Sequence, residues 1–261
     1  MRAVKSIVDA ILADPESDDL RRQCAARLGS LGDPRGEFIR LQLDLVEMRR
    51  DPDRGGAYHE ASARASELLR LHGARWAAEV APMVEGLTFR RGFIDEVKVK
   101  ASAFDALAPA IYARAPVLHL EVIEAAGNMG ALCASAHLGR IVSLGLFGQR
   151  IGDEGVRALA GSTHLGRLSW LDLGHNGIGE EGLEVLCASA GLPRLRWVNL
   201  GGNPAPNPTP RPVMDGGVVM GYDRPDLADE IEARFGALPW LNETFEDTRF
   251  GVPEQDHFVG R

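Results

Sequence analysis

A 27-residue segment that recurs in the second half of the chain constrains the fold more than any other feature. LGRIVSLGLFGQRIGDEG begins at Leu138, LGRLSWLDLGHNGIGEEG begins at Leu165, and LPRLRWVNLGGNPAP begins at Leu192. Repeats of this length indicate an array of one supersecondary unit, because a single unit cannot bury its own apolar face. The sequence therefore predicts stacked strand–turn–helix units instead of one closed core.

Each position of the repeat has a physical role. The apolar pairs alternate with period two, so both members point to one side of a short strand. Asn176 and Asn203, with Gln149 at the matching position, fall where the chain turns inward and where a side-chain amide can bond buried backbone groups. Acidic pairs then begin a helix, where they complement unpaired N–H groups. The strand pairs are Leu144/Leu146, Leu171/Leu173 and Val198/Leu200, and the acidic pairs are Asp153/Glu154 and Glu180/Glu181.

Weaker copies extend the array in both directions. Leu118 and Leu120 fit at a spacing of 26, although Ile123 stands where Asn is expected. Val97 and Val99 lie a further 21 residues back. On the C-terminal side, LADEIEARFG predicts another helix and LPWL predicts a terminal strand.

These residues resemble the leucine-rich-repeat family, in its longer ribonuclease-inhibitor-like form, over about residues 97 to 203. The resemblance implies an α/β fold: a short solenoid with parallel strands on its concave side and helices outside. It also implies function through contact with another protein.

The N-terminal part of the chain predicts helices without a repeat. Residues 3–13 have apolar side chains at helical spacing, and a second helix closes on Gly29 or Gly32. A third begins near Pro34, since proline suits a first helical turn, and a fourth covers residues 58–72. The expected organisation is a helical cap in 1–80, the solenoid in 81–203, and a proline-rich loop with an acidic cap or tail in 204–261.

This N-terminal stretch resembles the bacterial repeat-companion domain, a helical module found in front of leucine-rich repeats. The resemblance rests on AILADPESDDLR, GDPRGEFIRLQLDL, LHGARW and FRRGFIDEV, between Ile7 and Val97. The chain departs from the module at 26–30, where ARLGS replaces a stretch like Ala-Asp-Trp-Leu-Glu. The resemblance implies a bacterial origin and an N-terminal cap, and it assigns no activity.

Strand alternation also predicts which side chains face a partner. If the leucines of each pair point inward, Trp170 and Trp197 lie at matching outward positions on adjacent strands, about 5 Å apart. Tryptophan is among the residues most enriched at binding hot spots. Partner-binding residues are therefore expected at Phe147, Trp170, Asp172, Trp197, Asn199 and His119.

The C-terminal tail offers an alternative use for the tryptophans. PAPNPTPRP, from Pro204, has five prolines in nine residues and is not expected inside a strand or helix. GGVVMGYD follows as an apolar patch that could pair at a sheet edge. Residues 204–261 hold 11 acids against 5 arginines, a net charge of −6. The tail could fold back as a lid, lie in solvent, or mimic an acidic substrate.

Composition limits the classes of partner and the cell compartment that we expect. The formal net charge of −8 argues against nucleic acid, which requires clustered basic residues. No N-terminal signal and no apolar run of membrane-spanning length is present, so no membrane association is expected. The three cysteines have no metal-ligand spacing and are expected to be reduced packing residues in the cytoplasm.

No motif of known chemistry occurs, including the glycine-rich phosphate loops, the zinc-protease helix and the nucleophile elbow. We therefore expect a non-catalytic protein-interaction module that binds a partner protein through the concave face of the solenoid, without a metal, a cofactor or a small-molecule substrate. One alternative is an inhibitor or immunity-type neutraliser of a toxin or effector enzyme. Another is an enzyme with its site between the helical cap and the solenoid, which would need convergent titratable groups there.

Overall fold

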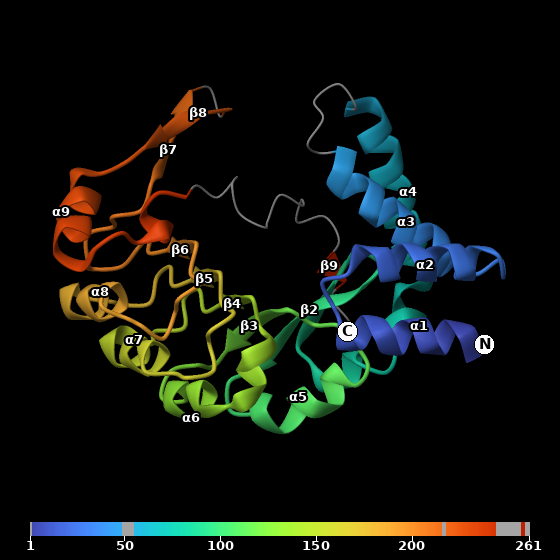
Figure 1. Cartoon of the computed structure of the whole chain (residues 1–261), viewed down its shortest axis with the longest axis horizontal. Coiled ribbons are helices and arrows are strands. Elements are labelled where there is room, and N and C mark those ends of the chain that lie inside the picture. The colour runs from blue at the N-terminus through green and yellow to red at the C-terminus, as the bar shows by residue number, and fades with distance from the viewer. Residues whose placement is uncertain (1, 49–54, 216–217, 244–256, 259–261) are drawn as a thin grey trace. The chain divides into compact units, whose positions relative to one another are not determined.

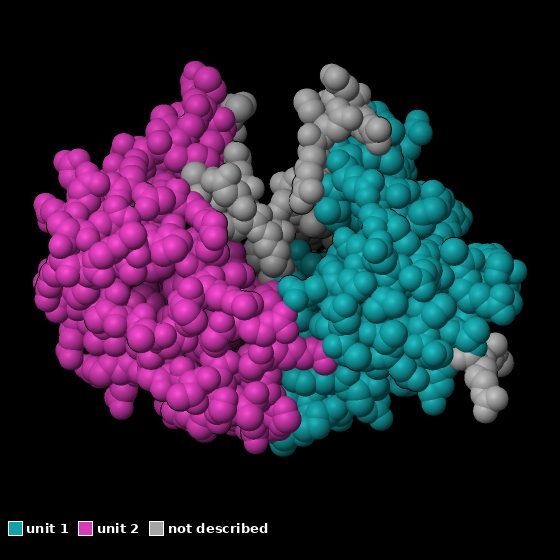
Figure 2. Space-filling view, in the orientation of Figure 1, with its two compact units in different colours: residues 1–99, 106–119, 251–261 teal, residues 100–105, 120–250 magenta. Residues whose placement is uncertain are grey.

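The computed structural model describes residues 2–48, 55–215, 218–243 and 257–258, and these form two compact units. The first unit comprises Met1–Val99, Ala106–His119 and Gly251–Arg261, and the second comprises Lys100–Asp105 and Leu120–Phe250 (Figure 2). The first unit therefore extends beyond the expected helical segment of 1–80, because two strands that follow the helices pack with them.

Local signals explain the helices of the first unit, α1 (Arg2–Ala13), α2 (Asp18–Gly29), α3 (Pro34–Met48) and α4 (Gly55–Ala77). The Ser17 hydroxyl accepts a hydrogen bond from the Leu20 N–H at 3.3 Å, which caps α2. Pro34 occupies the first position of α3, as predicted. All four expected helices are present, and α2 ends at Gly29.

An antiparallel hairpin follows the helices, with strands β1 (Gly86–Arg90) and β2 (Phe93–Lys100). Arg91 and Gly92 both have positive φ at its turn. Gly92 also lies against α3, where an added Cβ would come within 2.7 Å of the Ile39 Cα. The amide of Gln42 closes this contact, accepting from the Gly92 N–H at 2.6 Å and donating to the Phe89 carbonyl at 3.3 Å. The repeat pattern located Val97 and Val99 on a strand but did not predict the hairpin.

In the second unit, the 27-residue repeat forms an in-register parallel sheet. Strands β4 (Ser143–Gly145), β5 (Trp170–Asp172) and β6 (Trp197–Asn199) pair so that Leu144, Leu171 and Val198 are partners. These three side chains are at most 1% exposed. Helices α6 (Met129–Ala134), α7 (Gly152–Ala160) and α8 (Glu180–Cys187) lie side by side along one side of these strands (Figure 1).

The predicted turn amides hold neighbouring repeats together. Asn176 is 1% exposed, and its amide donates to the carbonyls of Leu146 (2.8 Å) and Gly174 (3.1 Å). Asn203 donates to Leu173 and Leu200, each at 2.9 Å. Each bond that crosses between repeats satisfies a carbonyl that a short strand leaves without a ladder partner. This mixed arrangement of parallel strands and helices fits a leucine-rich-repeat-like α/β fold.

The remaining described elements complete both units. They are η2 (Ala81–Met83), α5 (Phe104–Tyr112), β3 (His119–Ile123), η3 (Ala136–Arg140), β7 (Arg211–Asp215), β8 (Val218–Asp223), α9 (Asp226–Phe235), η4 (Pro239–Leu241) and β9 (His257–Phe258).

Two predictions for the C-terminal segment were wrong. Pro212 lies inside β7, which is tolerated because β7 and β8 form a two-stranded antiparallel hairpin with open edges. LPWL forms the 3-10 helix η4 instead of a strand, and it buries Trp240 and Leu241. The helix predicted from Leu227 is confirmed as α9.

Candidate functional site: a tryptophan surface on the repeat strands

The outward positions of β5 and β6 carry a stacked pair of tryptophans. Trp170 and Trp197 are direct register partners, and their ring centroids are 4.5 Å apart with an interplanar angle of 8°. Both are half-buried, whereas Leu171 and Val198 beside them are fully buried. The predicted alternation and the predicted stacking are therefore confirmed. Zero register between parallel strands places residues 27 apart directly beside each other.

A polar pair lies one position further along the same face. The Asp172 carboxylate accepts hydrogen bonds from the Gly174 N–H and the Asn199 amide, both at 2.9 Å. Burial raises the pKa of Asp172, and these two hydrogen bonds oppose that shift. The nearby charge of Glu121 adds to the rise. Asp172 is therefore a carboxylate whose negative charge is poorly solvated, and a donor from a partner would stabilise it.

Phe147 and His175 form the edge of this face. Phe147 is 56% exposed, and its ring packs edge-on against the His175 ring at a centroid distance of 5.1 Å. Glycines make room for both rings: a Cβ on Gly174 would lie 2.9 Å from the Phe147 ring, and a Cβ on Gly202 would lie 2.3 Å from the His175 ring. The sequence analysis did not include His175 in this face. Gly202, which lies one repeat after His175, was the available signal, because a glycine at that position leaves room for the imidazole ring.

These residues together define the tryptophan surface, which consists of Phe147, Trp170, Asp172, His175, Trp197 and Asn199.

His119 does not belong to the tryptophan surface, and its expected exposure was wrong. Its side chain is buried in the first unit, with Nε2 3.5 Å from the Asp95 carboxylate. Arg91 reaches the same carboxylate at 3.3 Å. The alternation rule failed here because the buried Asp95 carboxylate lies close enough to interact with the imidazole, and this contact holds the His119 side chain in the interior.

The structure describes only part of the C-terminal tail that could fold back over the tryptophans. Residues 244–256, which form much of the predicted lid, lie outside the described residues. Before them, Glu243 makes an ion pair with Arg196, and η4 packs near β6. The described part of the C-terminal segment, up to Glu243, therefore lies against β6, the last of the three repeat strands.

The tryptophan surface brings several kinds of side chain together. It combines two large stacked rings, an exposed phenyl ring and one under-solvated carboxylate. Across the described part of the chain, no three His, Cys, Asp or Glu side chains cluster in a way that could hold a metal ion. None of the helices that the structure describes is both long and apolar enough to cross a membrane.

Comparisons with known proteins agree with the repeat. A family model described as Leucine Rich repeat matches residues 168–187, which cover β5 and α8. No curated protein matches the chain. The match and the register of the strands support a leucine-rich-repeat protein, a class that suggests a protein–protein interaction module.

Proposed function

We propose that this chain is a non-catalytic module that binds a partner protein through the tryptophan surface. The observation that carries the proposal is the stacked, half-buried pair Trp170–Trp197. Aromatic side chains bring large apolar area to an interface at little cost in conformational entropy, and tryptophan is enriched at hot spots. Two such rings fixed against each other form a pre-organised contact.

The charges beside the rings favour a basic or amide-rich partner segment. Asp172 can accept further donors, and the stacked rings present π-electron density to a cation. An arginine of the partner could lie over a ring and donate to Asp172 at once. We further propose a cytoplasmic, bacterial setting with the N-terminal helices as a companion cap, supported by the residue patterns of that segment.

An inhibitor or neutraliser of a toxin or effector enzyme is the second candidate. The net charge of −6 over residues 204–261 favours it, because an acidic surface complements enzymes with basic substrate sites. The identity of the captured partner separates this role from that of an adaptor. The enzyme alternative would require measured turnover.

Site-specific crosslinking tests the proposed surface. A photoreactive phenylalanine analogue replaces Phe147, and a matched variant carries it at Arg157, an exposed position on α7. We expect position 147 to capture a partner in cells and position 157 not to capture it. Trp170→Ala with Trp197→Ala should weaken binding of that partner by more than about 2 kcal/mol.

Two results would count against the surface. Equal crosslinking from both positions would mean that capture is non-specific. An unchanged affinity of a folded double-alanine protein would mean that the tryptophans are not anchors. An intramolecular crosslink from position 147 to a peptide of the C-terminal tail would support the lid instead.

A further inference from the structure

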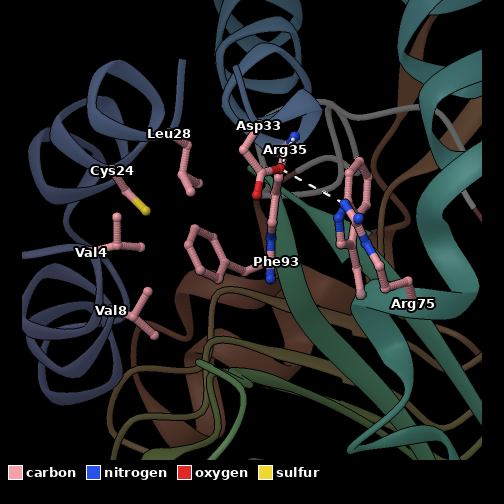
Figure 3. A pocket seen from close by; sticks show the side chains of 9 residues that line it. Val4, Val8, Cys24, Leu28, Asp33, Arg35, Arg75 and Phe93 are labelled. Carbon is pink, nitrogen blue, oxygen red and sulfur yellow. Dashed lines mark hydrogen bonds and ion pairs between the residues drawn. The ribbon is translucent and has the colours of Figure 1, made fainter. Parts of the chain in front are cut away.

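A cavity of about 260 Å³ lies inside the first unit, far in sequence from the tryptophan surface. Figure 3 shows Val4, Val8, Cys24 and Leu28 on one side of it and Arg35 and Arg75 on the other. The remaining lining residues are Asp33, Trp76 and Phe93. One wall is therefore apolar, and the other carries two guanidinium groups and one carboxylate.

Arg35 packs against aromatic rings, and it forms no ion pair with another residue that the structure describes. Its guanidinium lies 4.8 Å from the centroid of the Phe93 ring and 5.9 Å from that of Trp76. Its Nε is buried and has no hydrogen-bond partner in the described part of the chain. Burial lowers the pKa of Arg35, so water does not fully compensate its charge.

Asp33, the one carboxylate among the described lining residues, is already engaged. Asp33 accepts the backbone N–H of Arg35 at 2.9 Å, and Arg75 approaches the same oxygen at 3.9 Å. The described lining residues then carry one positive charge in excess, and the buried Nε of Arg35 is left without a hydrogen-bond partner among the described residues. A planar guanidinium fixed between rings is suited to bidentate recognition of a carboxylate.

The size of the cavity limits what accompanies that carboxylate. An apolar cavity of about 150 Å³ holds a benzene ring, as in the engineered lysozyme case. This cavity is larger, which leaves room for a carboxyl group and its linker beside a ring of that size. Val4, Val8 and Leu28 would contact the apolar part of the ligand, while Arg35 and Arg75 face its charged end.

We propose that this cavity binds a carboxylate carried on an aromatic or branched apolar group. A free aromatic acid and the C-terminal residue of a peptide share this chemistry. The proposal does not depend on the tryptophan surface, because it rests on residues of the first unit alone.

Calorimetric titration of the full chain tests this site, with phenylacetate as the probe and phenylacetamide as its neutral counterpart. We expect saturable binding of one phenylacetate per chain and at least about tenfold weaker binding of the amide. Arg35→Met should weaken phenylacetate binding by about tenfold to a hundredfold, the loss typical of a hydrogen bond to a charged group. Arg40→Met is the matched control, an exposed arginine on the same helix that does not line the cavity.

A second ligand identifies the source of the carboxylate. A second variant keeps the test decisive if the first one does not fold. Tighter binding of an acetyl-Gly-Gly-Phe peptide acid than of phenylacetate would indicate a chain terminus, and the reverse order would indicate a free acid. If circular dichroism shows that Arg35→Met unfolds, Arg75→Gln at the exposed end should still weaken binding several-fold. The proposal is wrong if wild type does not bind phenylacetate, if it binds the amide equally well, or if a folded Arg35→Met or Arg75→Gln protein binds like wild type.

Discussion

Asn176→Ala is the substitution that most directly tests how the repeats are held together. The side chain makes three hydrogen bonds, to the carbonyls of Leu146 and Gly174 and from the Ile151 N–H at 3.4 Å. Gly174 O keeps a second donor, the Gly148 N–H at 2.9 Å, and Leu146 O keeps the Gln149 N–H at 3.3 Å. The Ile151 N–H loses the acceptor that it has in the structure.

The expected cost follows from these partners. Each hydrogen bond contributes about 1 kcal/mol net, and an unsatisfied buried donor costs about 1–3 kcal/mol. Because two of the three partners keep another bond, we expect Asn176→Ala to lower the free energy of unfolding by about 3 kcal/mol. Asn176→Asp should cost at least as much at pH 7, since it points a carboxylate oxygen at two carbonyl oxygens.

Urea unfolding followed by circular dichroism measures this difference, with an unchanged m-value as the check on two-state behaviour. Asn128→Ala is the matched control, because the amide of Asn128 also donates to two carbonyls but does so at the surface. Water can replace those bonds, so its cost should stay below about 1 kcal/mol. Equal losses at the two positions would refute the view that buried turn amides hold the repeats together.

Three further predictions concern charge, thiols and glycines. The pKa of Asp172 is raised in the folded state, so the folded protein binds this proton more tightly than the unfolded chain does. The stability that this proton contributes is complete below the pKa of the unfolded chain, and it is lost as pH rises through the folded-state pKa. Asp172→Asn should therefore gain stability relative to wild type between pH 3.5 and pH 7, measured by urea unfolding, and a pH-independent difference would contradict this. Burial raises the pKa of Cys133 and of Cys187 to about 12; the native protein should react with an aromatic disulfide reagent at pH 8 only slowly, and rapid reaction at either residue before unfolding would disagree. Gly92→Ala should cost at least about 2 kcal/mol, because its φ of +82° and the Ile39 backbone both oppose a Cβ. Gly174→Ala should cost less than Gly92→Ala in the same unfolding assay, since its Cβ meets side-chain atoms of Phe147 and Asn199 instead of backbone; similar losses at both glycines would be inconsistent with this distinction.

Prediction from the sequence succeeded where a single physical rule, the repeat period, determined the structure. The 27-residue period located β4 to β6, the inward leucines and the tryptophan stack, because strand register follows directly from the repeat. It failed for His119, where the buried carboxylate of Asp95 comes from β2, a weaker copy whose spacing of 21 residues departs from the 27-residue period. It also failed at LPWL, where burial of Trp240 and Leu241 decides the backbone and an apolar run alone cannot distinguish a strand from a short helix.

The tryptophan surface follows from the same rule that makes the repeats stack. Strand register places residues that are 27 apart in the sequence next to each other on adjacent strands, and such residues form a row across the sheet. A substitution in one repeat therefore changes the contacts of its neighbours in the same row. The row Ser143, Trp170 and Trp197 becomes aromatic only in its last two members, and the row Gly145, Asp172 and Asn199 becomes polar in the same two. Both changes coincide on β5 and β6, although the apolar positions between them stay apolar for packing. The outward positions of β5 and β6 are half-buried and are not bound by that packing requirement, so these two rows can change between repeats while the buried row stays apolar.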